Sequence, residues 1–436
     1  MKLFNWEQTG LERVEQLLKT GSPDMEELRE LLSCCNVAFV LEGINRLQST
    51  LLCELKFSYV QQSQRYVAAG AADLELSFLK QADQLRVRQA VEKLYRLYEA
   101  MSEKKPDAPK GRPRPQDYRY GIPIEDARYL LPLSAKTNLS VAMEGSGLIP
   151  LFSRLLGAQY SGIWEELKTQ LLEHLPRRLG ELLLTVPPER PSGLVSEFYR
   201  PLLDQVTQDN RIAYLDGFSD LEQRVALGAL TSTQQRTPSQ VLADWGDEAP
   251  QKARGVIRRV MGYGHTSIAE QARTTFGMMC SLVTYHQQIR HRLPQLHREE
   301  LSELITRPRE FLVPPTVEAS PFLEEYRRTV VQVRQLREEL YAEYGFPVLV
   351  LLLNCDQIRL VLSANARMDC DMLSQRICRT AQWEIRQLSE QKYQALHRFS
   401  QQLYRNALPS CIYGACKEGA MSCGQMELMR KQYREE

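Results

Sequence analysis

Residues 287–292 read QQIRHR and place two arginines and a histidine at three consecutive positions. Two fixed positive charges beside an imidazole suit the binding of phosphates or of an electron-rich ring, because guanidinium groups donate paired, charge-assisted hydrogen bonds. Taken alone, a short basic cluster of this kind is more often a solvated surface turn. The rest of the sequence has to decide between these two interpretations.

Polar motifs flank this stretch on both sides. The segment GHTS (264–267) precedes it, NAR (365–367) ends the apolar stretch IRLVLSANA (358–366), and AQWEI (381–385) follows. Arg376 lies nine residues after the arginine of NAR, on the next predicted helix, so the asparagine and both arginines can point into one cleft. By itself, such a group is more often a buried salt-bridge network than a functional site.

Composition excludes several classes of function. The chain has 436 residues, well beyond the usual length of a single domain, so more than one domain is expected. Its 55 Lys+Arg and 54 Asp+Glu give a formal net charge of +1, which provides no field to attract a nucleic acid. The start of the chain shows no apolar signal segment, and the longest apolar run, 348–353, is too short to span a membrane. We therefore expect a soluble, cytoplasmic protein that binds neither nucleic acids nor membranes, with its 10 cysteines reduced.

Two proline-rich segments, 104–117 and 186–193, interrupt the chain. Proline is disfavoured in helix interiors and in central strands, so both segments indicate loops. The second segment lies near the midpoint of the sequence. We therefore predict two domains, residues 1–190 and residues 195–436.

A weak internal repeat supports this division. The first half contains GIPIEDARYLLPL (121–133) and, further on, IWEEL (163–167). The second half contains GFPVLVLLL (345–353) and then QWEIRQL (382–388). A similar order of elements is thus expected twice along the chain.

Apolar periodicity predicts an α+β fold in which helices dominate. The β-branched and apolar segments 36–42 and 358–366 are typical of strands. We predict a helix from Ser320, as N-cap, to Gly345, as the glycine that follows its last turn. A second long helix is predicted from an apolar stripe at spacings of three and four, formed by Leu373, Ile377, Ala381, Ile385 and Leu388.

The ordered set of motifs resembles the flavin-dependent thymidylate synthase family. The matches are G-H-x-S with Glu270 three residues on, Q-x-x-R-H-R, N-A-R with a further arginine eleven residues after its asparagine, and A-Q-W-E-I. The resemblance implies helix-rich α+β domains, each with a mostly antiparallel sheet. It also implies reductive methylation of dUMP to dTMP, with methylenetetrahydrofolate and NADPH as co-substrates and FAD as hydride carrier.

Each half lacks motifs that the other half keeps. In the family, R-H-R is followed by S-x-R-Y, but the second half has Glu300 at the position of that serine. The first half supplies the missing motif at residues 63–66, and Arg128 there matches a substrate-binding arginine of the family. Conversely, the first half has Cys53-Glu54-Leu55 at the R-H-R position and Glu144-Gly145-Ser146 in place of N-A-R.

These complementary losses predict a fused tandem of two diverged copies with a composite active site between the two halves. Family members are homotetramers whose active sites are built from neighbouring subunits. Four copies of the domain are present in two fused chains, so we expect a homodimer with pseudo-tetrameric symmetry.

The resemblance assigns roles residue by residue. The flavin-binding set is His265, Ser267, Arg290, His291, Arg292, Asn365, Arg367 and Asp371, where Asp371 stands in place of the family's asparagine. The set that binds dUMP or a related pyrimidine nucleotide is Gln61, Gln62, Ser63, Gln64, Arg65, Arg128, Gln287, Arg290 and Arg376, where Gln61 replaces the family's glutamate. Arg376 is also the catalytic residue, because a fixed cation stabilises the N3-deprotonated uracil. Ser63 is expected to bind phosphate rather than to act as a nucleophile.

Cys411, Cys416 and Cys423 form a C-terminal pattern that resembles tails in part of the same family. Three cysteines fit a zinc or cluster site that lacks one ligand, and Cys370 or Cys378 are the available fourth thiols. Reduced structural thiols are the alternative, and we assign no metal ligand.

Two other functions stay open at this stage. The substitutions at Gln61 and Asp371 are compatible with a flavoenzyme that acts on another pyrimidine nucleotide. A catalytically silent, nucleotide-binding homologue would keep the fold with only part of the site.

Overall fold

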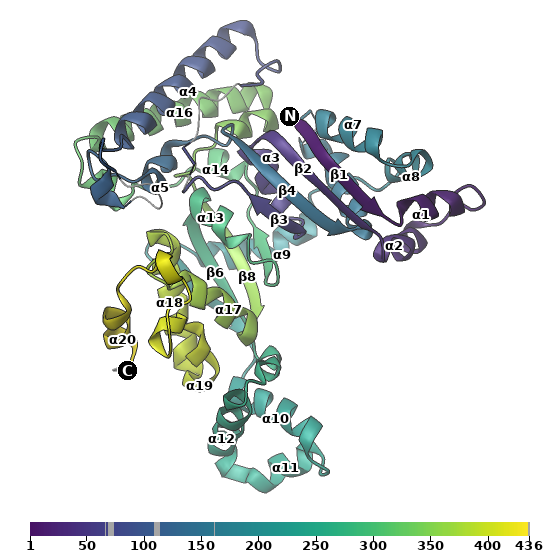
Figure 1. Cartoon of the computed structure of the whole chain (residues 1–436), viewed down its shortest axis with the longest axis vertical. Helices are drawn as coiled ribbons and strands as arrows, with labels where there is room; N and C mark the ends of the chain where they lie inside the picture. The colour runs from purple at the N-terminus through teal and green to yellow at the C-terminus, as the bar shows by residue number, and fades with distance from the viewer. Residues whose placement is uncertain (66, 69–73, 109–113, 161, 435–436) are drawn as a thin grey trace. The chain divides into compact units, whose positions relative to one another are not determined.

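The computed structural model describes residues 1–65, 67–68, 74–108, 114–160 and 162–434 (Figure 1). The chain forms two compact units. The first unit comprises Met1–Gly193, Ser281–Arg290 and Glu300–Gln357, and the second comprises Leu194–Cys280, His291–Glu299 and Ile358–Glu436. Two segments of the second sequence half therefore belong to the first unit. The division into homologous halves, 1–190 and 195–436, stays a proposal about the repeats.

The first unit is built on a four-stranded antiparallel sheet in the order β1-β2-β4-β3. Its strands are β1 (Lys2–Thr9), β2 (Asn36–Asn45), β3 (Ser58–Gln61) and β4 (Lys136–Glu144). Buried and exposed residues alternate strictly along β4, as expected for a strand with one face against the core. β2 confirms the predicted strand at 36–42.

Helices of both sequence halves complete this unit. Those of the first half are α1 (Leu11–Leu17), α2 (Met25–Ser33), α3 (Arg46–Cys53), α4 (Gln81–Met101), α5 (Ile124–Ala127), α6 (Leu148–Leu155), α7 (Glu165–His174) and α8 (Arg177–Leu183). Those of the second half are α13 (Leu282–Gln288), α14 (Glu303–Thr306), α15 (Pro315–Glu318) and α16 (Leu323–Tyr344). The long helices α4 and α16 lie side by side (Figure 1).

The helices α3 and α13 begin in the same way. The N–H groups of Arg46 and Leu47 donate to the carbonyls of Ala135 and Leu133, at 2.9 and 3.0 Å. In the same pattern, Leu282 and Val283 donate to Asp356 and Asn354, at 2.9 and 3.2 Å. The two acceptor segments also pair with each other, through an antiparallel bridge between Pro132 and Leu353. Corresponding pieces of the two repeats therefore face each other within one unit.

The second unit contains a sheet in the order β5-β6-β8-β7, in which β5 with β6 and β7 with β8 are antiparallel. Its strands are β5 (Ile212–Gly217), β6 (Arg273–Ser281), β7 (Gln295–Arg298) and β8 (Gln357–Asn365). The helices are α9 (Gly193–Asp204), α10 (Leu221–Thr233), α11 (Pro238–Trp245), α12 (Ala249–Gly262), α17 (Ala366–Arg376), α18 (Trp383–Phe399), α19 (Gln401–Tyr404) and α20 (Met426–Arg434).

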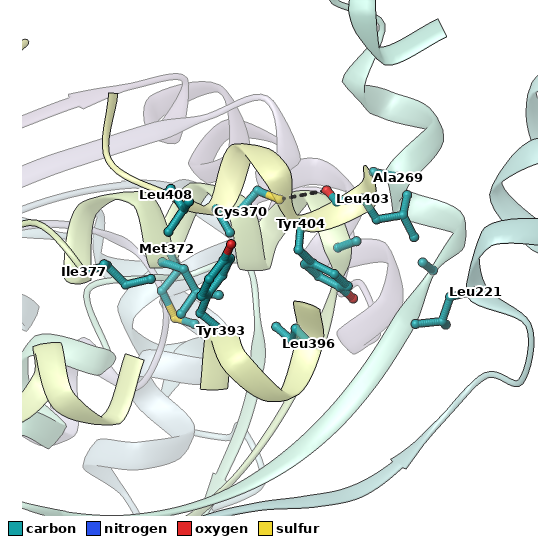
Figure 2. Packing of buried hydrophobic residues seen from close by; sticks show 14 of the residues in the cluster. Leu221, Ala269, Cys370, Met372, Ile377, Tyr393, Leu396, Leu403, Tyr404 and Leu408 are labelled. Carbon is teal, nitrogen blue, oxygen red and sulfur yellow. Dashed lines mark hydrogen bonds between the residues drawn. The ribbon is translucent and has the colours of Figure 1, made fainter. Parts of the chain in front are cut away.

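The core of this unit packs the C-terminal helices against β6 (Figure 2). Leu373 of α17, Leu396 of α18 and Tyr404 of α19 are fully buried. One ion pair is buried with them, since Lys392 Nζ lies 2.6 Å from Asp369 Oδ1. Mutual pairing allows two charges to be buried at this depth.

The predicted helix-rich α+β fold with a mostly antiparallel sheet in each half is confirmed, and each sheet has four strands. The strand predicted at 358–366 is confirmed as well. The predicted continuous helix through Leu373 and Leu388 is wrong. α17 ends at Arg376, and Gln382 caps a new helix by accepting hydrogen bonds from the N–H groups of Glu384 and Ile385, at 3.0 and 3.3 Å. Side-chain capping satisfies N–H groups that would otherwise need a preceding turn, so the helix restarts at that point.

Helix boundaries elsewhere shift only slightly. α16 begins at Leu323, so Ser320 is not its N-cap, and it ends directly before Gly345, as predicted. Gly345 has φ 68°, a conformation that favours glycine. Within the described ranges, no helix combines the length and the apolar character that crossing a membrane requires.

Candidate functional site

Arg128 is held in the first unit by the turn that contains it. The short helix α5 ends at Ala127, and Arg128 Nε donates back to the carbonyl of Glu125 at 3.0 Å. The side chain is 4% exposed, and its Nη2 has no hydrogen-bond partner. Burial, followed by the charge of Arg65, lowers the pKa of Arg128 to about 10. This guanidinium is therefore a buried cation with an unused donor.

The segment 61–65 lies against the same turn. Arg65 Nε donates to Glu125 Oε2 at 2.7 Å, so Glu125 holds one arginine with its carboxylate and the other with its carbonyl. Ser63 Oγ accepts from the N–H of Arg65 at 3.2 Å. Gln64 is buried, and its Nε2 has no partner. Tyr66, the last residue of the S-x-R-Y match, lies outside the described residues.

Asn354 joins these two pieces. Its Nδ2 donates to the carbonyl of Arg128 at 2.9 Å and lies 3.4 Å from Gln64 Oε1, while its own Oδ1 has no partner. The other two glutamines are placed near the strand ends. Gln62 Oε1 accepts from Asn138 Nδ2 at 3.3 Å, and Gln61 Nε2 donates to Ser49 Oγ.

The second half contributes α13 to this same unit. Gln287 is buried on α13 with its Nε2 3.3 Å from the carbonyl of Val283, and Arg290 follows as an exposed residue. Burial, followed by the charges of Arg290 and Arg128, lowers the pKa of Arg46 of α3 to about 9. Residues predicted from both sequence halves therefore lie in one compact unit around a set of guanidinium groups.

The electrostatics of this group favour an anion. Arg46, Arg128 and Gln64 are all at least nine-tenths buried, and each has a donor nitrogen without a partner among the residues that the structure describes. An unpaired buried donor costs free energy, and an unpaired buried charge costs more, unless a ligand satisfies it. Phosphate oxygens are the acceptors that guanidinium groups bind best.

Most of the predicted flavin residues lie in the second unit. His265 and Ser267 are exposed at the start of the 3-10 helix η6 (Thr266–Gln271), and α17 packs against η6. Arg367 Nη1 on α17 lies 2.6 Å from Glu270 Oε1 on η6. Asp371 is exposed one turn further along α17.

Asn365 has a structural task in this arrangement. Its Oδ1 accepts from the N–H of Met368 at 2.9 Å and caps α17, and the residue is buried. The asparagine of N-A-R therefore orients the helix that carries the arginine, which the sequence alone does not distinguish from direct ligand binding.

His291 and Arg376 contact each other within the second unit. Arg376 Nε donates to His291 Nε2 at 2.8 Å, which requires that nitrogen to be unprotonated. Arg292 is exposed. Arg290 is the member of the flavin set that belongs to the first unit, and Arg376 is the member of the nucleotide set that belongs to the second.

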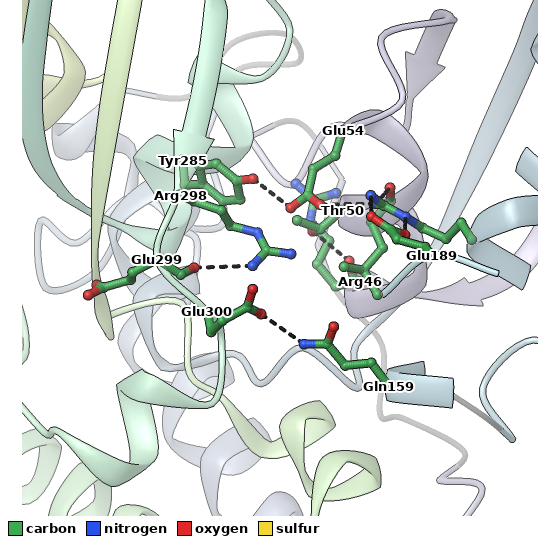
Figure 3. A network of polar contacts seen from close by, with 11 residues as sticks. Arg46, Thr50, Glu54, Gln159, Glu189, Tyr285, Arg298, Glu299 and Glu300 are labelled. Carbon is green, nitrogen blue, oxygen red and sulfur yellow. Dashed lines mark hydrogen bonds and ion pairs between the residues drawn. The ribbon is translucent and has the colours of Figure 1, made fainter. Parts of the chain in front are cut away.

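In the first half, a residue of a different kind occupies the position that corresponds to Arg290. Because α3 and α13 start with equivalent hydrogen bonds, Arg290 corresponds to Glu54, one residue beyond the predicted Cys53. Glu54 accepts from Tyr285 Oη at 2.6 Å and from Arg154 Nη1 at 3.0 Å, and Figure 3 shows its carboxylate directed at Tyr285. The lost arginine has thus been replaced by a structural carboxylate.

In the first half, close packing leaves no room for a side chain at the middle position of the segment that corresponds to N-A-R. A Cβ at Gly145 would lie 2.8 Å from Cys35 Cβ and 2.9 Å from the carbonyl of Leu32 at the end of α2. A larger residue does not fit there without a backbone shift. This explains physically why Glu144-Gly145-Ser146 no longer resembles the motif.

The C-terminal cysteines pack near one another. Burial raises the pKa of Cys411, and the neighbouring Cys378, Cys416 and Cys423 act in the same direction. Across the residues that the structure describes, no group of three or more His, Cys, Asp or Glu side chains is arranged to hold a metal ion.

Sequence reasoning missed three residues of the first unit: Arg46, Glu125 and Asn354. Arg46 and Asn354 could have been found from the sequence, because each is a polar residue in an apolar context. Arg46 begins a buried helix, and Asn354 follows the apolar run VLVLLL (348–353). Glu125 gave no such signal, since it lies in a polar turn.

Comparison with known proteins identifies the family. The model of the family described as thymidylate synthase complementing protein matches residues 14–166 and 214–400, one region in each half. The chain therefore belongs to this family, and the two matches agree with the tandem layout. A curated relative, the flavin-dependent thymidylate synthase of Clostridium tetani, is 26% identical over 215 residues, which are 43% of this chain and 83% of the relative. The enzyme of that name from Geobacter sulfurreducens is 29% identical over 188 residues, 41% of this chain and 80% of its own.

Among solved structures, a flavin-dependent thymidylate synthase from Helicobacter pylori, complexed with FAD and dUMP, aligns with a TM-score of 0.37 and 19% identity. The alignment covers 45% of this chain and 99% of that chain. A UMP/dUMP methylase from Streptomyces cacaoi aligns with a TM-score of 0.34 and 20% identity, covering 45% of this chain and 92% of that one.

Proposed function

We propose that the chain is a flavin-dependent thymidylate synthase-type methyltransferase that converts dUMP to dTMP. Methylenetetrahydrofolate would supply the carbon, and NADPH the reducing equivalents, with FAD as the bound redox cofactor. Family membership supports the reaction class. The observation that carries the proposal is the buried set of unpartnered donors, Arg128 Nη2 and Gln64 Nε2, next to Arg65 in the first unit.

The nucleotide phosphate is the natural partner of these donors. Arg128 and Gln64 are fixed through Asn354, and Arg65 is fixed through Glu125, so little conformational entropy is lost when the anion binds. Gln287 and Arg290 come from the second half and lie in the same unit. In this proposal, these residues of both sequence halves bind the nucleotide phosphate within the first unit.

The donors on the second unit suit a flavin nucleotide. Ser267 supplies a hydroxyl group, and Arg292 and Arg367 supply exposed cations for a diphosphate, while α17 and η6 are in contact. When bound, FAD would supply the hydride that turns the transferred methylene group into a methyl group. His265, Asn365 and Asp371 keep the supporting roles that the resemblance gives them.

The chain's own part in the chemistry is electrostatic. C5 of uracil gains the carbon and loses its proton, and it is more nucleophilic when N3 of the ring is deprotonated. Arg376 keeps the role that the resemblance gives it, a fixed cation for that anionic ring. The contact of Arg376 Nε with His291 Nε2 holds the guanidinium in one orientation. No nucleophile of the protein is needed.

The test is a direct assay of the purified chain. Absorbance should reveal bound oxidised FAD, and incubation with dUMP, methylenetetrahydrofolate and NADPH should yield dTMP. Removing any one of these should abolish product. A colourless protein that binds dUMP and forms no dTMP would instead be a silent nucleotide-binding homologue.

A second candidate substrate is another pyrimidine nucleotide such as UMP. It is favoured by Gln61, which replaces the family's glutamate and is turned toward Ser49 Oγ. Competition between UMP and dUMP in the same assay decides between the two. Preference for UMP by kcat/KM would replace dUMP as the natural substrate.

Assembly and location complete the proposal. We expect a homodimer with pseudo-tetrameric symmetry in the cytoplasm. Light scattering after gel filtration measures the mass in solution, and a monomer with full activity would contradict the expected assembly.

A further inference from the structure

Arg46 is the first residue of α3 and is 2% exposed. Its backbone is fixed from two sides, because Asn45 caps the helix with a capping box and the N–H of Arg46 donates to Ala135 at 2.9 Å. The family motifs do not include this position. A buried arginine there needs its own explanation.

A closed ring of hydrogen bonds holds the Arg46 side chain. Nε of Arg46 donates to Nδ1 of His286 at 3.3 Å, and Nε2 of His286 lies 2.7 Å from Oγ1 of Thr50. Thr50 in turn donates to the carbonyl of Arg46 at 2.7 Å. This order requires the neutral His286 tautomer with hydrogen on Nε2. Burial and the charges of Arg46, Arg128 and Arg290 hold the pKa of His286 well below its usual value, so the ring stays neutral.

The ring leaves one end of the guanidinium unused. Nη1 of Arg46 is buried and has no hydrogen-bond partner within the described ranges of the chain. In the described part of the chain, no carboxylate forms an ion pair with Arg46, and Arg290 and Arg128 are the cations that act on it. A buried cation that other cations repel is costly to keep, unless a bound anion compensates its charge.

The ring adjoins the proposed nucleotide residues through α13. Val283, one turn before His286, donates to the carbonyl of Asn354 at 3.2 Å, and Asn354 Nδ2 donates to the carbonyl of Arg128 at 2.9 Å. Figure 3 shows Arg46 and Thr50 on α3, the helix that ends at Cys53 directly before Glu54. Arg46 and Arg128 are thus connected through hydrogen bonds of His286 and Val283, which lie one turn apart on α13, and through Asn354.

We infer that Arg46 is an anion-binding residue of the nucleotide site, which donates from Nη1 to a phosphate oxygen, and that neutral His286 is the positioning residue that orients it. The inference rests on the proposed function for the identity of the nucleotide. Its physical content is independent of the reaction, because it states that a phosphate group accepts hydrogen bonds from Arg46 Nη1 and Arg128 Nη2. The first repeat then supplies a cation at a position where the family motif has none.

The test compares the wild-type chain with R46Q by isothermal titration of dUMP, deoxyuridine and inorganic phosphate. Loss of one charged hydrogen bond should weaken dUMP and phosphate by about tenfold to hundredfold. Deoxyuridine, which lacks the phosphate, should bind R46Q and wild type equally. The melting temperature of ligand-free R46Q should be no lower than that of wild type, because the variant removes an uncompensated buried charge.

R154Q is the matched control. Arg154 is also a buried arginine of the first half, but it is paired with Glu54 and Glu189, at 3.0 and 2.6 Å. This variant should lower the melting temperature and leave the affinity for dUMP unchanged. The positioning role is tested with H286Q and H286L, since glutamine keeps an acceptor for Arg46 and leucine does not. Phosphate affinity should be retained in H286Q and lost in H286L.

Several results would overturn the inference. Wild-type affinity of R46Q for phosphate would remove Arg46 from the site, and equal losses for deoxyuridine and dUMP would make its role structural. Failure of R46Q to fold would show that the charge is compensated within the chain. If wild type binds phosphate but not dUMP, the proposed function fails, and the phosphate titration still decides the role of Arg46.

Discussion

The guanidinium groups of Arg46 and Arg128 are buried with one nitrogen each left unpaired, which packing alone would not favour. Arg154, buried to a similar extent, has two carboxylate partners. The contrast separates two uses of the same side chain. Arg154 stabilises the fold, whereas in the proposed site the bound anion would stabilise Arg46 and Arg128.

His286 gives this site a pH dependence. The pKa of His286 is held well below 6.5, so below that pH the unfolded chain binds a proton that the native chain does not. Stability should therefore fall with pH below about 6.5, by about 1.4 kcal/mol per pH unit for this residue. Urea unfolding at pH 7.0 and 5.5 should show a larger loss for wild type than for H286Q. Equal losses would mean that His286 is protonated in the folded protein.

The exposed arginines of R-H-R make a separate prediction. R290A/R292A should release FAD from the purified protein while the melting temperature stays nearly unchanged, because exposed side chains contribute little to the core. R258A/R259A, which removes two exposed arginines of α12, is the control and should retain the flavin. Flavin absorbance after gel filtration measures both. Stoichiometric flavin in R290A/R292A would exclude these arginines from the site.

At the scale of elements, local patterns identified strands well and helix limits less well. Apolar β-branched runs identified β2 and β8 because their side chains face a core. The apolar stripe through Leu373 and Leu388 suggested one helix, yet Gln382 caps a second one. Apolar periodicity shows which face of a helix is buried. Two successive helices that pack against the same core have a similar apolar stripe, so periodicity does not show where the first ends and the second begins. A glutamine acting as a cap has no strong signature in sequence.

The capping role of Asn365 predicts a graded effect on the flavin side. N365A should lower the free energy of unfolding by about 0.5–2 kcal/mol and weaken flavin binding, because α17 loses its cap and carries Arg367. N365D keeps a capping oxygen and should retain most of the stability. Chemical denaturation and flavin titration of the two variants measure these effects. If N365D loses flavin as fully as N365A does, the amide binds the cofactor directly.

At the scale of the whole molecule, the sequence predicted the two repeats but not how they exchange segments. Motif losses predicted that Ser63, Arg65 and Arg128 act together with residues of the second half. Nothing in local periodicity showed that 281–290 and 300–357 pack in the first unit. That packing depends on pairing between distant segments, such as Pro132 with Leu353, for which a single sequence carries no signal.

Separate expression of the halves tests this organisation. Fragments 1–190 and 195–436 should each fail to form dTMP, because the proposed nucleotide site needs groups of both, and misplacement of about 1 Å can cost about a hundredfold in rate. Co-expression should restore part of the activity. Assays of flavin content, dUMP binding and methyl transfer on each preparation measure the outcome. Full activity of 195–436 alone would show that the first half is only structural.

Because residues 300–357 belong to the first unit, this unit can complete its folding only late in translation. The core of that unit is incomplete until Gln357 has been translated, although all four strands of its sheet are present by Glu144. At about 5–20 residues per second, the stretch from Gly193 to Gln357 takes roughly ten to thirty seconds. During that interval the nascent first half exposes the surface that α13 and α16 later cover. A chaperone that binds apolar segments should therefore be recovered with ribosomes stalled before residue 281. Less of it should be recovered with ribosomes stalled well beyond residue 357.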